Sequence, residues 1–173
     1  NVAFDAVIEE KDVQHTIYEL PLVLAEQGLD ELILVHFRMA KPSAKLQPWR
    51  KLVDTIINPT RTVKIAVIGK YSELQDAYKS IFESIYHGGY AHQAKVEIMK
   101  LAAEEIEEGK HLDELKQADG ILVPGGFGTR GVEGKIKAIQ FARENNVPFF
   151  GICLGLQCAV IEFSRNVCGL NGA

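Results

Sequence analysis

The sequence has few cysteines, no excess of basic residues and no long apolar run. Its three cysteines, Cys153, Cys158 and Cys168, form no C-x-x-C spacing, which argues against a disulfide framework and a zinc site and favours a reducing, cytoplasmic compartment. Lysine and arginine number 19 against 23 acidic residues, and the net charge of −4 argues against a nucleic-acid partner or an anionic membrane surface. The longest nearly apolar stretch, residues 149–161, is shorter than the roughly 18–20 residues of a membrane-spanning helix.

The pattern of a secreted protein is also missing. The first residues are acidic where a signal peptide needs a basic start and an apolar run, and there is no initiator Met, so we expect the chain to begin inside a longer protein or after processing. Glycine and proline, with 15 and 6 residues, follow no period, which excludes a collagen-like fibre. An apolar content of 47% excludes overall disorder, and 173 residues fit one domain, or one domain and an incomplete piece.

Strand-like and helix-like segments alternate from residue 62 onward. Short apolar runs predict strands over 62–69, 95–101, 119–124 and 147–152. Helical spacing of apolar residues predicts short helices within 104–117 and longer helices over 73–87 (ending at Gly88-Gly89), 132–145 and 154–167. This order is typical of an α/β fold with a mostly parallel sheet and helices on both faces. Because such sheets bind ligands outside the carboxyl ends of their strands, the candidate loops are 69–73, 124–131 and 152–155.

The first 60 residues have a different character. They predict helices over 15–27, 29–38 and 49–57, joined by a connector that contains two prolines. This composition is that of a tail and a connector, so we expect no independent core. The apolar residues that should then stay poorly buried are Leu20, Leu22, Leu24, Leu32, Ile33 and Val35.

The sharpest motif is Gly151-Ile152-Cys153-Leu154-Gly155, at a junction between a predicted strand and a helix. It has the form of a nucleophile elbow, in which small neighbours allow a tight turn that exposes the nucleophile. The helix that follows directs its positive end at the sulfur, which favours the thiolate, and the N–H of Leu154 can stabilise an oxyanion. A small buried cysteine in a strand is the commoner fate of this residue type, and the spacing alone leaves both interpretations open. The catalytic interpretation predicts Cys153 at the carboxyl end of a central strand.

A second motif, Pro124-Gly125-Gly126-Phe127-Gly128, follows the third predicted strand. Its glycine N–H groups can form an anion-binding nest, and Gly126 can supply a second oxyanion donor to the elbow. Taken alone, the motif is more often an ordinary glycine-rich turn. It is not a dinucleotide fingerprint, because no helix and acidic residue follow at the required positions.

Longer segments around both motifs resemble the CTP synthase family: LVPGGFGTRGVEGK at 122–135, PFFGICLGLQCAVIEFSRNV at 148–167 and GKYSELQDAYKSI at 69–81. The pattern P-G-G-F-G-x-R-G-x-E-G-K is narrower than the general class I glutamine amidotransferase signature. Residues 7–30 are similar to the end of that family's amidoligase (synthetase) domain. The resemblance covers essentially the whole chain. It implies an end of the synthetase domain at 1–40, a linker at 41–61 and the first part of a flavodoxin-like amidotransferase domain at 62–173, incomplete at the C-terminus.

The resemblance also implies roles for individual residues. Cys153 matches the nucleophile that forms a glutamyl thioester, and Gly126 and Leu154 match the oxyanion-hole donors. The glutamine pocket is matched by Leu154, Gly155, Leu156 and Gln157, with Leu156 in place of the family's usual Met. A mobile lid linked to activation by GTP is matched by Thr129, Arg130, Gly131 and Glu133. A segment that contacts the adenine of ATP is matched by Lys11, Asp12 and Val13, although the sequence just after them is one residue longer than usual.

The family resemblance further implies the substrates glutamine, UTP and ATP, Mg²⁺ with ligands upstream of this chain, and a homotetramer. It places the general base, a His, and its orienting Glu beyond Ala173, so we expect the isolated chain to be a poor glutaminase. The five histidines, His15, His36, His87, His92 and His111, have no metal-ligand spacing, and Cys158 and Cys168 are interpreted as packing residues. Two alternatives stay open: another class I amidotransferase, such as the GMP synthase glutaminase, which should lack a synthetase-like tail, and a non-enzymatic binding domain that keeps the fold and a reactive cysteine.

Overall fold

The computed structural model describes residues 3–40, 45–70 and 75–173, and it divides into two compact units, Asn1–Thr60 and Arg61–Ala173. The predicted helix start at residues 73 and 74, most of the loop 69–73 and part of the 41–61 linker lie outside the described residues. The first unit contains η1 (Phe4–Ala6), η2 (Ile17–Glu19), α1 (Leu20–Glu26), α2 (Leu29–His36) and α3 (Gln47–Ile57).

The first unit has little buried apolar surface. Of the six apolar residues expected to be poorly covered, only Leu22 is buried, whereas Ile33 and Val35 are 46% and 56% exposed. The aromatic residues Trp49 of α3 and Tyr18 of η2 contact each other, and the Trp49 indole N–H donates to the Tyr18 carbonyl at 2.7 Å. The expectation that these six residues share no deep core is therefore confirmed.

The second unit is built on a four-stranded parallel sheet in the order β2-β1-β3-β4. In β3, Val123 lies opposite Gly151 of β4, so the carboxyl ends of these two strands are level. Among the described strands β4 pairs with β3 alone, so the expectation that the candidate nucleophile follows a central strand is wrong here: it follows an edge strand. The strands are β1 (Arg61–Gly69), β2 (Ala94–Ala102), β3 (Gly120–Val123) and β4 (Phe149–Gly151).

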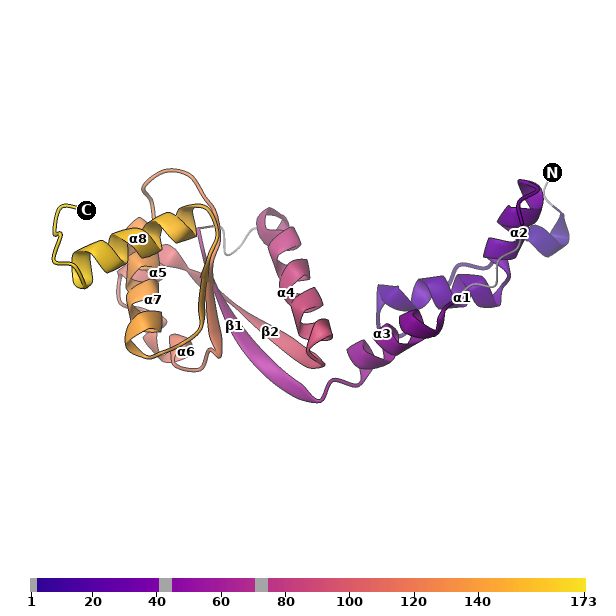
Figure 1. The fold of residues 1–173 in the computed structure, drawn as a ribbon, viewed down its shortest axis with the longest axis horizontal. Helices are drawn as coiled ribbons and strands as arrows, with labels where there is room; N and C mark the ends of the chain where they lie inside the picture. The colour runs from indigo at the N-terminus through magenta and orange to yellow at the C-terminus, as the bar shows by residue number, and fades with distance from the viewer. Residues whose placement is uncertain (1–2, 41–44, 71–74) are drawn as a thin grey trace. The chain divides into compact units, whose positions relative to one another are not determined.

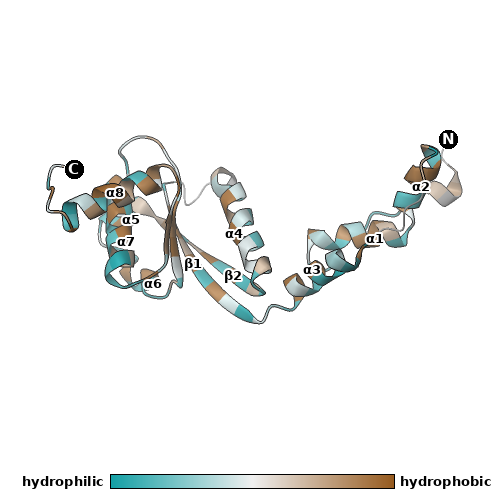
Figure 2. Cartoon of the chain, in the orientation of Figure 1, coloured by the Kyte–Doolittle hydropathy of each residue, from teal (hydrophilic) through white to brown (hydrophobic). Residues whose placement is uncertain are grey.

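Helices cover both faces of the sheet, as the α/β prediction requires (Figure 1). Alternate residues of each strand point to opposite faces: in β3, Ile121 and Val123 join one core, and Leu122 joins the other. In Figure 2 the strands β1 and β2 carry both hydrophilic and hydrophobic bands, whereas β3 is buried throughout. One face carries η3 (Gln75–Tyr78) and α4 (Lys79–Ala91), and the other carries α5 (Ala103–Glu107), α6 (Leu112–Leu115), α7 (Val132–Glu144) and α8 (Leu154–Asn166).

The predicted end of the helix before β2 is wrong. Gly88-Gly89 does not stop α4, which continues to Ala91. Gly89 is buried, and a Cβ at this position would lie 2.5 Å from Val96 Cγ2 and 2.8 Å from the Ala94 carbonyl oxygen. The glycine thus allows the helix to pack closely on β2, and this contact outweighs the low helix propensity of glycine.

An ion pair fixes α7 against α8. The Glu162 side chain is buried, with 1% of the residue exposed, and it accepts hydrogen bonds from Arg143 at 2.8–3.1 Å and from Asn166 at 3.1 Å. Hydrogen bonding to Arg143 lowers the pKa of Glu162. Because three donor groups surround this carboxylate, its charge is compensated although it lies in the interior.

The two non-nucleophilic cysteines differ in burial. Cys158 of α8 is fully buried in the core, as its interpretation as a packing residue requires. Cys168 is exposed just past the end of α8, so the packing interpretation is wrong for it. The helix ends at Asn166, and the chain then leaves the face that packs on the sheet. Among the described helices, none is long and apolar enough to cross a membrane.

Candidate active site

Cys153 occupies a strained turn between β4 and α8. It is exposed, and its backbone has φ 52° and ψ −109°. A non-glycine residue at positive φ is uncommon and costs on the order of 1–3 kcal/mol, so the surrounding structure must hold it there. The turn projects the sulfur from the carboxyl end of the sheet, as the nucleophile-elbow pattern predicts.

The two glycines of the motif are required by contacts on either side of this turn. A Cβ on Gly155 would overlap the Val123 carbonyl oxygen of β3. A Cβ on Gly151 would lie 2.6 Å from the Gly155 carbonyl carbon and 2.8 Å from the Leu156 nitrogen. The first turn of α8 therefore packs closely against both β3 and β4, and this packing holds Cys153 in its strained conformation.

The N-terminus of α8 starts directly at the sulfur-bearing residue. The Gln157 N–H donates to the Cys153 carbonyl at 3.1 Å, which closes the first helical turn. The N–H of Leu154, the first helical residue, has no acceptor within the helix and lies next to Cys153. Leu154 is partly buried and Gly155 is buried, whereas Leu156 and Gln157 are exposed on the first turn. These four predicted pocket residues therefore follow Cys153 directly, on the first turn of α8.

The glycine loop after β3 lies beside the elbow. A Cβ on Gly125 would be 3.5 Å from Cys153 Cβ, and a Cβ on Gly126 would be 3.6 Å from Leu154 Cδ2. The structure thus brings together Cys153, Leu154 and Gly126, which lie in two loops that follow adjacent strands. Backbone N–H groups close to a thiol are what an acyl-transfer reaction needs to stabilise its oxyanion.

A scan against protein families matches residues 73–172 to the family "Glutamine amidotransferase class-I". The matched segment includes the elbow and the glycine loop, and it covers more than half of the chain. The chain belongs to the class-I glutamine amidotransferases.

The relatives narrow this assignment. A CTP synthase of Nitratidesulfovibrio vulgaris is 53% identical over 173 residues, which are all of this chain and 31% of that protein. A CTP synthase of Methanocaldococcus jannaschii is 52% identical over 176 residues, with 98% of this chain and 32% of that protein covered. The chain thus spans about a third of the length of these curated relatives.

A solved structure titled "Trypanosoma brucei CTPS - glutaminase domain with bound acivicin" is 49% identical, with a TM-score of 0.56 over 62% of this chain and 42% of that one. This similarity agrees with the amidotransferase fold described above. The α/β fold class is confirmed by the parallel sheet, by the family match and by this structure.

One residue of this amidotransferase site was missed by the sequence analysis. Lys135 of α7 is 1% exposed, and its Nζ lies 3.4 Å from the position of a Cβ on Gly126. The signal was present: Val132, Lys135, Ile136 and Ile139 follow the spacing of one helical face, so the lysine interrupts an apolar stripe.

The predicted lid residues form the connection between the glycine loop and α7. The Arg130 Nε pairs with Glu104 at 2.7 Å, and Glu133 accepts a hydrogen bond from Arg165 at 3.0 Å. Gly131 has φ 74°, and a Cβ there would lie 3.0 Å from Ala103 Cβ. Thr129 is exposed, and its carbonyl accepts from the Val132 N–H. Salt bridges and a backbone contact thus hold this segment against α5 and α8.

The segment predicted to contact ATP belongs to the first unit. Lys11 and Asp12 are exposed and Val13 is half-buried, outside any helix or strand, and Lys11 pairs with Glu9 at 2.8 Å. The described residues contain no group of three His, Cys, Asp or Glu side chains able to hold a metal ion.

Two of the histidines, His92 and His111, have contacts away from the elbow. His111 contacts Glu105 at 2.8 Å and Glu114 at 3.1 Å, and these carboxylates raise its pKa. The His92 carbonyl accepts a hydrogen bond from Arg61 at the amino end of β1, opposite to the edge that carries Cys153. Within the described residues, no histidine is hydrogen-bonded to Cys153.

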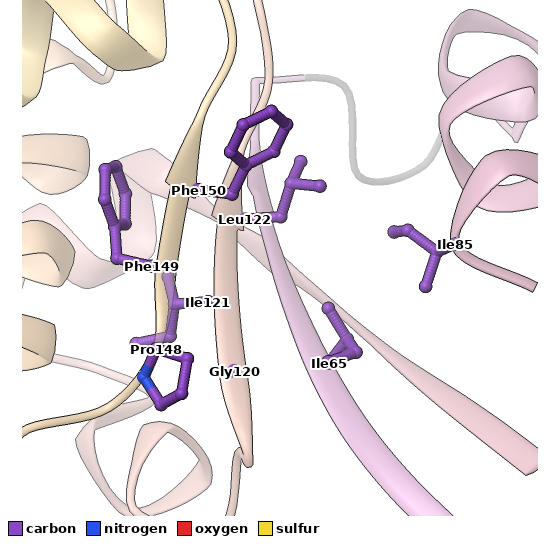
Figure 3. A pocket seen from close by; sticks show the side chains of 8 residues that line it. All are labelled: Ile65, Ile85, Gly120, Ile121, Leu122, Pro148, Phe149 and Phe150. Carbon is purple, nitrogen blue, oxygen red and sulfur yellow. The ribbon is translucent and has the colours of Figure 1, made fainter. Parts of the chain in front are cut away.

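The apolar hollow in Figure 3 is separate from this chemistry. It has a volume of about 250 Å³ and lies over the amino-terminal part of β3 and β4, next to Ile85 of α4. Phe149 and Phe150 point to opposite faces of β4 in this view, and Phe150 is 63% exposed. The hollow has no titratable side chain in its lining, so we assign the amidotransferase site to the elbow, where the nucleophile lies.

Proposed function

We propose that this chain carries the nucleophile and the oxyanion donors of a glutaminase centre. The observation that carries the proposal is the conformation of Cys153. It has φ 52° at a strand-to-helix turn and lies beside the glycine loop and the first turn of α8. A cysteine that only packed in the core would not need this strained and exposed position, and Cys158 shows the packing alternative on the same helix.

The arrangement performs the first half of amide hydrolysis. The Cys153 thiolate attacks the side-chain carbonyl carbon of glutamine; an S–C bond forms, and the C=O electron pair moves to the oxygen. The N–H groups of Gly126 and Leu154 receive this oxyanion. When the electron pair returns, the C–N bond breaks and the protonated amine leaves as ammonia, with a glutamyl thioester left on Cys153. Water then hydrolyses the thioester to glutamate and the free thiol.

The proton that ammonia takes needs a general acid, normally a histidine. Since no described histidine is hydrogen-bonded to Cys153, we propose that this acid comes from outside the chain.

For the whole protein, we propose the activity named for its relatives, CTP synthesis. Ammonia from glutamine would displace a phosphate from UTP that ATP has phosphorylated. The relatives support this over another class-I amidotransferase, because their similarity extends through residues 1–60 as well as the amidotransferase segment. Mg²⁺ for the ATP step, GTP activation through the segment from Thr129 to Glu133, an ATP contact at residues 11–13 and a homotetramer belong to the same proposal. So does a cytoplasmic location, which is supported by three free cysteines.

The glutaminase proposal is tested by labelling the chain with a chloroketone analogue of glutamine and mapping the modified cysteines by peptide mass spectrometry. We expect Cys153 to react faster than Cys168, although both thiols are exposed, and glutamine to protect Cys153 alone. Cys158 is a second internal control, because burial raises the pKa of its thiol. Equal labelling of Cys153 and Cys168, unaffected by glutamine, would favour the non-enzymatic binding domain instead.

The CTP synthase proposal is tested with a chimera. The matching third of the Nitratidesulfovibrio vulgaris CTP synthase is replaced by this chain, and CTP formation from UTP and ATP is measured with glutamine or with ammonia. We expect both nitrogen sources to be used. The Cys153→Ala chimera should lose only the glutamine-dependent reaction. A chimera that makes CTP from ammonia but not from glutamine, even with Cys153 present, would contradict the proposal.

A further inference from the structure

Lys135 is a buried cation next to the proposed oxyanion hole. Only 1% of the residue is exposed, and its Nζ lies 3.4 Å from where a Cβ on Gly126 would be. It makes no hydrogen bond or ion pair with any of the residues that the structure describes. Burial desolvates this ammonium and disfavours its charged form, so its retention beside a glycine loop needs a reason other than stability.

Two lysines approach the glycine loop. Lys70 donates from Nζ to the Phe127 carbonyl at 3.0 Å. Lys70 is therefore held by the loop backbone, whereas the Lys135 ammonium lies next to Gly126. Two positive charges thus lie near the segment whose N–H groups would meet an anionic intermediate.

We propose that Lys135 is a positioning residue for the glutaminase step: its ammonium sets the Gly125-Gly126 turn and stabilises the negative charge that develops on the substrate oxygen held by the Gly126 N–H. This inference rests on the proposed glutaminase function. The effect belongs to the transition state, because the substrate amide is neutral and its oxygen becomes negative only as the S–C bond forms. The proposal also explains why residue 126 is a glycine, because a Cβ there would lie only 3.4 Å from the Lys135 Nζ.

The proposal requires a protonated Lys135. Burial lowers the pKa of its ammonium, so this charge is lost at a pH below the value of 10.5 that is usual for lysine. The titratable and charged groups around it come from three elements: Cys158 of α8, Glu104 of α5 and Lys70 after β1. Cys158 and Glu104 raise the pKa of Lys135, and Lys70 lowers it.

The test compares two reagents on Cys153 of the full 173-residue chain. The glutamine-analogue chloroketone places its carbonyl oxygen in the proposed hole; its S–C bond forms as chloride leaves. Iodoacetamide alkylates the same thiolate without using the hole. A change in the fraction of Cys153 present as thiolate affects both rates equally and therefore cancels in their ratio. Lys135→Met keeps the side-chain size and removes the charge. Lys137→Met removes an exposed lysine of the same helix as a matched control.

We expect Lys135→Met to lower the rate ratio roughly 10-fold, less than the 10²–10³ typical when a direct oxyanion donor is removed, and Lys137→Met to leave it unchanged. Lys135→Met should also unfold in urea at the same or a higher concentration than wild type, because an apolar residue of similar size replaces a desolvated charge. A purely structural lysine would give the opposite pattern, with lower stability and an unchanged ratio, and would overturn the proposal.

A second measurement needs no variant. In wild type, the rate ratio should fall as the pH rises through the titration of Lys135, and a ratio independent of pH up to 10.5 would overturn the role even if Lys135→Met failed to fold. The two proposals fail differently. Glutamine protection of Cys153 with equal ratios in wild type and Lys135→Met removes only the role of Lys135. Loss of glutamine protection in wild type removes the glutaminase function, and the role of Lys135 with it.

Discussion

Gly155→Ala tests whether packing against β3 holds the nucleophile in place. The added Cβ would overlap the Val123 carbonyl oxygen, and it would lie 2.9 Å from the Val123 carbonyl carbon and 3.1 Å from Val123 Cβ, all tighter than the 3.4 Å at which ordinary contact begins. These partners are backbone atoms and a β-branched stem in a buried strand, so they cannot rotate away. The first turn of α8 must therefore move away from β3 by roughly 1 Å, and overpacking of this kind costs typically ~1–3 kcal/mol.

The same movement displaces the Leu154 N–H from Gly126. A misplacement of about 1 Å can lower a reaction rate on the order of 10²-fold, so we expect chloroketone labelling of Cys153 to fall by about this factor. Urea unfolding followed by circular dichroism gives the stability change. Gly88→Ala is the control: this exposed glycine of α4 has nothing within 4 Å of its Cβ position, and alanine there should stabilise the chain by about 0.8–1 kcal/mol. Wild-type stability and labelling in Gly155→Ala would refute the packing argument.

Three further predictions concern charge and turnover. Arg143→Met leaves the buried Glu162 carboxylate without its main partner and should cost about 3 kcal/mol at neutral pH. The pKa of Glu162 is lowered in the folded state, so the ion pair stabilises the fold above the unfolded pKa near 4.5, and this stabilisation is lost as the pH falls through the folded pKa. The free energies of unfolding of wild type and Arg143→Met, measured in urea, should therefore converge in acid. A difference between them that does not change with pH would contradict this prediction. Glu105 and Glu114 raise the pKa of His111, so the charged histidine should add about 0.5 kcal/mol to the free energy of unfolding after solvent screening. This stabilisation should be complete below about pH 6.5, the value usual for histidine, and should vanish as the pH rises through the pKa of the folded state. His111→Asn keeps a residue suited to φ 64° and should abolish this pH dependence. The isolated chain should release glutamate from glutamine about 10²–10⁴-fold more slowly than a glutaminase with its general acid, and fast turnover that disappears in Cys153→Ala would show that a residue of this chain acts as the base.

Local pattern predicted most of the second unit because the signals there are short-range. Apolar runs and helical spacing placed the four described strands and the helices α7 and α8 to within two residues at each end. The elbow was visible for the same reason: a nucleophile on a tight turn needs small residues on both sides, and Gly151 and Gly155 are adjacent to it in sequence. The family resemblance, carried by the segments around the two motifs, is confirmed by the family match and the relatives.

Only tertiary structure decided which of these residues meet. Gly89 looked like a helix end, but it is the point at which α4 passes Val96 of β2, a contact that local propensity does not encode. The edge position of β4 depends on strand order, which pairing sets after the strands have formed. Lys135 and Glu162 received no role in the sequence analysis. Their burial follows from the packing of α7 on the glycine loop and on α8, which gives the carboxylate a partner in Arg143 and leaves the ammonium facing Gly126. The sequence alone thus predicted the elbow and its candidate nucleophile, because their signals are adjacent residues, and the packing of α7 on the glycine loop and on α8 decided which charges lie near it.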